Sequence, residues 1–193
     1  MKTFDLLLTV LMIQLMPISI LTGEGKKMEI DLMPVPASTV FTDGKFRLSE
    51  AFTIMVKGDA GDRLYRGATR TLRRLAGRTG IFFPQDYITP NTKNSSANLI
   101  IECSRTGKVI LHEDESYSLV VTPEEIKLSA NTDIGALRGL ETFLQLLKVD
   151  EDGYYLPAII IKDRPRFPWR GLLIDACRHF MPVEVIKRNL DGM

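Results

Sequence analysis

Hydrophobic side chains follow two different periods along the middle of the chain. At residues 62–76 and 133–148 they recur at helical spacing, and each segment carries one apolar stripe. Five shorter segments are alternating, β-branched or aromatic, which is the pattern of strands. They lie at residues 52–56, 98–103, 115–122, 126–130 and 155–161. The pattern therefore predicts the order β-α-β-β-β-α-β.

This order predicts the α+β class, with a mostly antiparallel sheet that carries two helices on one face. The connection at Pro123–Glu125 is short enough to join its flanking strands as an antiparallel hairpin. Both helical stripes would then be buried against the same side of the sheet. We expect residues 28–162 to form this domain, which is long enough to build its own core.

Polar residues and glycines set the limits of the first predicted helix. Asp62 belongs to the residue types favoured as N-caps, and Gly77 and Gly80 favour a helix end. Six arginines recur along this helix, mainly on its outer side, and a solvated helix face is the simplest interpretation. They are Arg63, Arg66, Arg70, Arg73, Arg74 and Arg78.

A second pattern begins after the proline-rich segment at 163–168, where we place a domain boundary. Residues 171–174 are a short apolar run between charged residues, which is typical of a fully buried parallel strand. Pro182 then precedes apolar residues at helical spacing. Residues 163–193 are therefore expected to hold the first βα unit of a second domain, an arrangement with which a (β/α)8 barrel begins.

Asp175, Arg178 and His179 directly follow this predicted strand. Barrels of this class carry their active sites at the C-terminal ends of their strands. Elsewhere, the carboxylate clusters at 113–115 and 124–125 fall at predicted turns, where we expect solvated loops.

Residues 1–23 differ from the rest of the chain. Lys2 is followed by an apolar stretch that Pro17 interrupts, which predicts a secretory signal cleaved near Gly23. The alternative is an uncleaved membrane anchor. With the signal removed, we expect a secreted or periplasmic protein that keeps no stable membrane contact.

Composition and cysteine spacing give no indication of a nucleic-acid partner or a metal site. Hydrophobic residues make up 45% and charged residues 25%, and the net charge is +1, so nothing points to a nucleic-acid partner. The two cysteines, Cys103 and Cys177, lack the spacing of metal ligands and fall in different predicted domains. We expect no metal, no other cofactor and no disulfide.

The sequence DRPRFPWRG at 163–171, followed by DACRHF at 175–180, resembles the opening of the catalytic barrel of family 20 β-N-acetylhexosaminidases. The stretches 115–121 and 135–147 are similar to the non-catalytic N-terminal domain of that family. Together the resemblance covers about residues 30–193.

The resemblance implies a retaining mechanism assisted by the substrate, in which a Glu acts as general acid and the preceding Asp orients the substrate's acetamido group. That pair would lie beyond Met193, so this chain is expected to hold no catalytic residue. Arg178 matches the family's arginine that binds sugar hydroxyls, with Asp175 and His179 as possible support. From spacing alone, Arg178 could equally pair with Asp175.

The resemblance also implies that the partners are glycans with terminal N-acetylhexosamine, and it leaves the oligomeric state open. Two alternatives remain. The chain could be a non-catalytic carbohydrate-associated module, or it could lead another glycosidase, such as a family 84 N-acetylglucosaminidase or an α-glucuronidase. For the hexosaminidase that the resemblance implies, the 193-residue chain alone is expected to be inactive.

Overall fold

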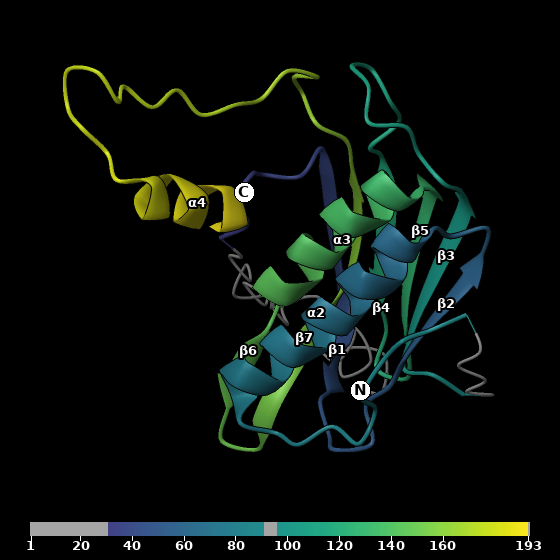
Figure 1. The fold of residues 1–193 in the computed structure, drawn as a ribbon. Helices are drawn as coiled ribbons and strands as arrows, with labels where there is room; N and C mark the ends of the chain where they lie inside the picture. Colours follow the sequence, from purple (N-terminus) through teal and green to yellow (C-terminus); the bar gives the residue numbers. More distant parts are fainter. Residues whose placement is uncertain (1–30, 91–95, 193) are drawn as a thin grey trace, which may run out of the picture. The chain divides into compact units, whose positions relative to one another are not determined.

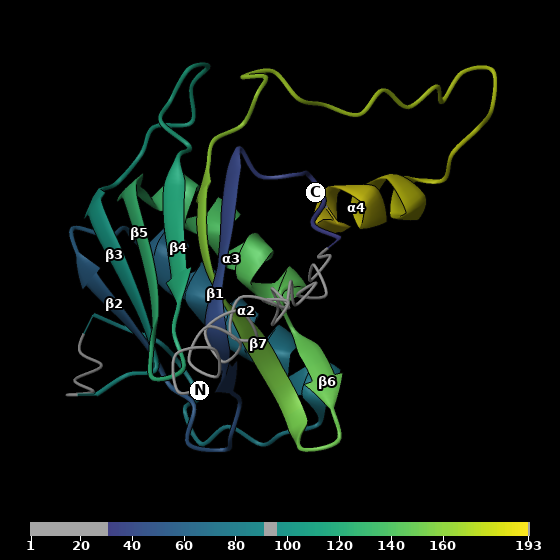
Figure 2. The same cartoon turned by 180° about the vertical axis from the view of Figure 1, so that it is seen from behind.

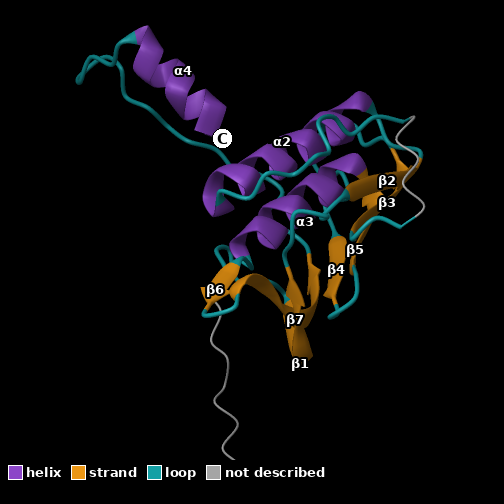
Figure 3. Ribbon diagram, turned by 90° about the horizontal axis from the view of Figure 1, so that it is seen from below, coloured by secondary structure: helices purple, strands orange, loops and turns teal. Residues whose placement is uncertain are grey.

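A computed structural model describes residues 31–90 and 96–192, so the predicted signal at 1–23 lies outside the described residues. From residue 31 the chain forms a seven-stranded mixed sheet, and two long helices lie side by side on one of its faces (Figures 1 and 3). This confirms the predicted α+β class with two helices on one face.

The described elements follow one another in the order β1 (Ser38–Arg47), β2 (Ile54–Gly58), α2 (Asp62–Thr79), β3 (Leu99–Arg105), β4 (Tyr117–Val121), β5 (Ile126–Thr132), α3 (Asp133–Gln145), β6 (Lys148–Asp150), β7 (Gly153–Asp163) and α4 (Val183–Gly192). In space the strands are ordered β1-β7-β4-β5-β3-β2, with β6 beside β7, as seen from behind in Figure 2. The pairs β2–β3 and β3–β5 are parallel and the other four are antiparallel. The sheet is thus mostly antiparallel, as expected.

Two strands were not predicted. β1 pairs with β7 at the edge of the sheet, and most of its side chains are exposed, so it lacks the apolar alternation of a half-buried strand. Its register shifts between Phe41 and Lys45, where Gly44 has a positive φ of 101°. β6 is only three residues long, and it replaces the predicted last turn of the second helix.

The first helix, α2, differs from its prediction at both ends. Gly61 rather than Asp62 is the N-cap, and no side chain caps it. Gly77 lies inside the helix, which ends at Thr79 because Gly80 takes the left-handed conformation at φ 70°.

The core lies between the helices and the covered face of the sheet. Ile101, Leu128, Leu119 and Ile161 are aligned across β3, β5, β4 and β7, and all four are fully buried. The strands alternate in burial, as a face packed on helices requires.

Helix α3 lies directly against β4 at its N-terminal end. A Cβ atom added at Gly135 would lie 2.4 Å from the Ser116 carbonyl oxygen, which is far inside van der Waals contact. Thr132 caps the helix by accepting from the Gly135 N–H at 3.1 Å, and its hydroxyl donates to the Asp114 carbonyl. The glycine and the cap together fix this end of α3 on the sheet.

The beginning of the second predicted domain differs from its prediction. Residues 164–182 contain no helix or strand, so the strand expected at 171–174 is absent, and Leu173 is 95% exposed. A parallel strand exists only when neighbouring strands take up its hydrogen bonds, and the described residues give this run no such neighbour. The helix expected after Pro182 is present as α4. In the described part of the chain, no helix has the length and apolarity needed to cross a bilayer.

Replacing Gly135 by Ala should destabilise the protein by about 1–3 kcal/mol, because α3 must move away from β4 to admit a methyl group. Gly77→Ala is the matched control, since this exposed position in α2 has nothing within 4 Å of an added Cβ. It should stabilise the helix by about 0.5–1 kcal/mol. Thermal or urea unfolding measures both changes, and equal effects of the two substitutions would contradict this packing.

Candidate functional site

The residues matched to the family's sugar-binding motif lie in the irregular segment after β7. The Arg178 guanidinium pairs with the Asp175 carboxylate at 2.5 Å between Nε and Oδ2. The backbone N–H groups of Cys177 and Arg178 also donate to Asp175 Oδ1, at 3.0 and 3.1 Å. The Arg178 N–H and then its guanidinium lower the pKa of Asp175 below its ordinary value. The structure therefore brings Arg178 and Asp175 together.

Solvent surrounds this pair. The Arg178 side chain is 90% exposed, and His179 is exposed as well. The Arg178 Nη atoms have no partner among residues 31–90 and 96–192. These nitrogens could donate to neighbouring hydroxyls, but sugar pockets enclose their ligand and this segment encloses nothing by itself.

Glu115 links this segment to the preceding domain. Its Oε2 accepts from Arg138 Nε on α3 at 2.8 Å and from Arg170 Nη2 at 2.5 Å, and its side chain is only 16% exposed. Burial disfavours the charge of Glu115, but the hydrogen bonds from the two arginines outweigh it and lower its pKa. The segment that follows β7 is thus tied to the start of β4 and to α3.

The two carboxylates before Glu115 are also paired. Glu113 accepts from both terminal nitrogens of Arg105, at 2.6 and 3.2 Å, and these bonds lead the causes that lower its pKa to about 2. Asp114 accepts from Ser116 and from the Asn131 amide. The prediction of a solvated loop at 113–115 is therefore wrong, because the loop folds around its carboxylates. Glu124 and Glu125 are exposed, as expected.

Three of the six arginines of α2 link this helix to α3, whereas the other three are exposed, as the prediction of a solvated face requires. Arg63 donates to the fully buried Asp133 carboxylate at 3.0 Å between Nε and Oδ2. Arg74 pairs with Glu141, and Arg78 donates to a carbonyl of α3. Sequence spacing missed these links because the partners lie about 66–70 residues further along the chain.

No metal centre is found in the part of the chain that the structure describes, since no cluster of three or more His, Cys, Asp or Glu side chains could hold an ion. Cys103 is buried, Cys177 is exposed, and both are free thiols.

Glu115→Gln should loosen the segment that carries Arg170, because the ion pair is lost while the size of the side chain is kept. The only tryptophan of the chain, Trp169, reports on this segment, and its fluorescence anisotropy should fall. Glu124→Gln, at an exposed carboxylate, is the control. An unchanged anisotropy in Glu115→Gln would contradict the link.

The same link has a pH dependence of known sign. A carboxylate whose folded-state pKa is lowered contributes stability above its unfolded pKa and loses it as the pH falls through the folded pKa. The parent anisotropy should therefore persist at pH 4.5, the ordinary pKa, and decline only in more acidic solution. There it should approach the value of Glu115→Gln.

Known proteins resemble this chain over much of its length. Beta-hexosaminidase subunit A2 of Dictyostelium discoideum is 31% identical over 182 residues, which cover 91% of this chain and 32% of the relative. Beta-hexosaminidase subunit beta of Mus musculus is 51% identical over 105 residues, or 54% of this chain and 20% of the relative. The chain thus spans at most about a third of the length of these relatives.

Solved structures show the same similarity. A chitobiase of Flavobacterium johnsoniae matches with a TM-score of 0.79 and 51% identity, over 84% of this chain and 25% of that protein. An exo-β-N-acetylglucosaminidase of Vibrio harveyi, solved with N-acetylglucosamine, matches with a TM-score of 0.61 and 28% identity, over 83% of this chain and 23% of that protein.

Two family models match the chain in succession. The model of glycosyl hydrolase family 20, domain 2, matches residues 29–164, and that of the family's catalytic domain matches residues 167–193. The change from one model to the other falls within the proline-rich segment at 163–168. The chain therefore belongs to glycosyl hydrolase family 20.

Proposed function

We propose that this chain is the leading part of a β-N-acetylhexosaminidase that removes terminal non-reducing N-acetylhexosamine from glycans. The observation that carries the proposal is the match of the catalytic-domain model to residues 167–193, directly after the domain 2 match. The names of the relatives support the substrate class, since they are β-hexosaminidases and a chitobiase.

In this proposal residues 28–162 form the leading domain and residues 163–193 begin the catalytic (β/α)8 barrel. The end of β7 at Asp163 and the irregular segment after it support this division. Residues 1–23 are proposed to be a secretory signal, which would place the protein outside the cytoplasm.

The proposed reaction is retaining and assisted by the substrate. The acetamido oxygen attacks the anomeric carbon, the glycosidic bond breaks, and a Glu general acid protonates the departing oxygen. Water then opens the oxazolinium ring with the same residue as base. Such an acid needs a raised pKa, so that it carries its proton at neutral pH.

The adjacent Asp-Glu pairs of this chain do not suit that role. Two arginines lower the pKa of Glu115, which is the opposite of what a general acid requires. Asp150 is held by Arg47 and Lys45 at the sheet edge, and its pKa is also lowered, while Glu151 beside it is exposed. These contacts support a catalytic pair outside this chain.

Arg178 is proposed to bind two neighbouring hydroxyls of the terminal sugar, with Asp175 as the residue that positions it. A guanidinium holds several N–H groups in one plane, and the Asp175 carboxylate occupies only its Nε side. His179 is proposed as further support. The remaining barrel would supply the walls that Arg178 lacks here.

The 193-residue chain alone should give only background hydrolysis of a chromogenic N-acetyl-β-glucosaminide. Loss of a general acid by itself costs about 10²–10⁴ in rate. Turnover by this chain that disappears in Arg178→Ala would show that the active site has been assigned wrongly.

A chimera tests the proposed activity directly. It continues this chain after Met193 with the corresponding remainder of the Flavobacterium johnsoniae chitobiase. The chimera should hydrolyse the substrate, and Arg178→Ala should lower kcat/KM by about 100-fold or more, since two hydrogen bonds from a charged group are lost. Arg188→Ala, on the exposed helix α4, is the control. A fully active Arg178→Ala chimera would refute the sugar-binding role.

A further inference from the structure

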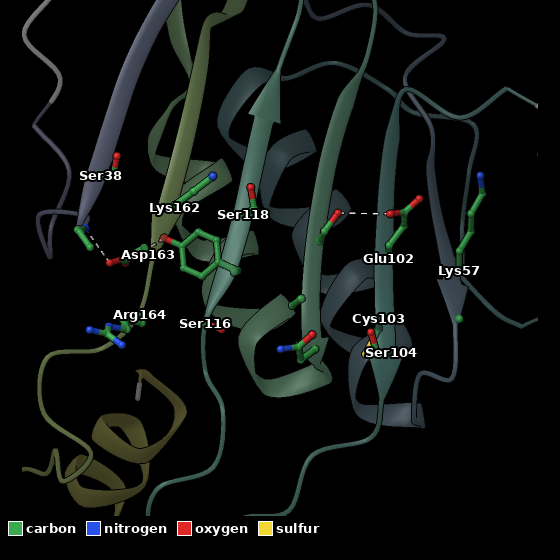
Figure 4. Close-up of a pocket in the computed structure, with 16 residues that line it drawn as sticks. Ser38, Lys57, Glu102, Cys103, Ser104, Ser116, Ser118, Lys162, Asp163 and Arg164 are labelled. Atoms are coloured by element: carbon green, nitrogen blue, oxygen red, sulfur yellow. Dashed lines mark hydrogen bonds between the residues drawn. The ribbon is translucent and has the colours of Figure 1, made fainter.

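Helices α2 and α3 cover only one face of the sheet (Figure 3). The opposite face carries a groove of about 740 Å³. One row of side chains crosses it in register from β1 to β2, and we call it the polar row. Its members are Ser38, Lys162, Ser118, Ser129, Glu102 and Lys57. Figure 4 shows these strands side by side with Arg164 and Ser116 below the row.

Three cations of this groove form no ion pair within the part of the chain that the structure describes. Lys162, Arg164 and Lys57 line it, and none of them has a carboxylate partner among residues 31–90 and 96–192. The Glu102 carboxylate is neutralised by Lys127 at 3.0 Å and also accepts from Ser129. Asp163 also lines the groove and keeps its negative charge, since the Ala37 N–H and the Tyr117 hydroxyl that donate to it are neutral. Three cations against two carboxylates, one of them paired with Lys127, leave the groove net positive, so it favours an anionic occupant.

Hydroxyl groups surround the cations at the β7 side of the groove. Ser38 on β1, Ser118 on β4 and Ser116 before β4 line it beside Lys162 and Arg164. The Ser38 and Ser118 hydroxyls can each donate one hydrogen bond and accept others, whereas the Ser116 hydroxyl already donates to Asp114 and can only accept. This set of groups suits a ligand that is itself rich in hydroxyls. An acidic peptide offers carboxylates but few such groups.

An apolar row lies next to the polar row on the same face. Its members are, in order across the sheet, Val40, Ile160, Val120, Lys127, Ile100 and Met55. Lys127 is the only charged member. Val40 is 54% exposed, and the other four apolar side chains are partly exposed. Sugar rings have apolar C–H faces beside polar edges, so a saccharide can contact both rows at once.

We propose that this groove binds an acidic stretch of a glycan chain, with its carboxylate or sulfate groups on Lys162 and Arg164 and its hydroxyls on the serines. The choice of a saccharide rests on the proposed hexosaminidase function. The groove would hold the polymer on the open face of the sheet and at the first residues after β7.

Binding to the purified 193-residue chain tests this site by calorimetry. The probe is a hexasaccharide of alternating N-acetylglucosamine and glucuronic acid, compared with a neutral N-acetylglucosamine oligomer of equal length. The acidic probe should bind, more weakly as ionic strength rises, and the neutral one should bind at least about 10-fold more weakly. Equal binding of the two probes would overturn the proposal.

Variants separate this groove from the rest of the surface. Lys162→Glu should weaken binding of the acidic probe by about 10-fold or more. Lys187→Glu makes the same charge change on exposed α4 and should have no effect. Ser118→Ala preserves charge and should still weaken binding. Thermal melts verify that each variant folds, and unchanged affinity in folded Lys162→Glu and Ser118→Ala would exclude the groove.

A poly-glutamate peptide distinguishes a saccharide site from simple charge attraction. If it binds as tightly as the acidic hexasaccharide, the saccharide part of the proposal is wrong. The chimera assay distinguishes failure of the groove proposal from failure of the hexosaminidase proposal. An active chimera together with no glycan binding by this chain would overturn the groove and leave the hexosaminidase function standing.

Discussion

The contact between α3 and β4 is the constraint on which the rest of the domain depends. Gly135 lies so close to the Ser116 carbonyl that any side chain at this position would push the helix away from the sheet. Thr132 holds the same end through its cap and its bond to Asp114. With α3 in this place, Arg138 reaches Glu115, and Glu115 in turn receives Arg170. Backbone packing thereby decides where the segment beyond β7 is attached.

Helix α2 is held against α3 by charge as well as by apolar contact. The fully buried Asp133 at the start of α3 accepts from Arg63 on α2 and from the Gly107 N–H, at 3.0 and 2.8 Å. A buried carboxylate is tolerated only when such donors compensate for its lost hydration. The helices and the loop between β3 and β4 therefore meet at one satisfied polar centre.

Sequence patterns predicted what depends on local periodicity. The stripes of α2 and α3 and the alternation of β4 and β5 are properties of each segment, so they were recognised. β1 was missed because an exposed edge strand has no apolar alternation to recognise. The prediction of a strand at 171–174 was wrong although this run has the apolar pattern of a strand. Such residues form a strand only when neighbouring strands lie beside them.

The candidate site also contains residues that the sequence could indicate and residues that it could not. No periodicity distinguishes Arg178 from any other arginine, so its proposed role came from the resemblance of DACRHF to a family motif. The role of Glu115 was missed because its partners are 23 and 55 residues away. Long-range ion pairs of this kind leave no signal in a single sequence.

Within one chain, a packed α+β domain is followed by residues 164–182, which form no helix or strand. Hydrogen exchange of the 193-residue chain, followed by mass spectrometry, tests this difference most directly. Amides of β4 and β5 should exchange only through global unfolding, whereas those of residues 171–174 should exchange nearly as fast as an unstructured peptide. Protection of 171–174 equal to that of the central strands would contradict the account.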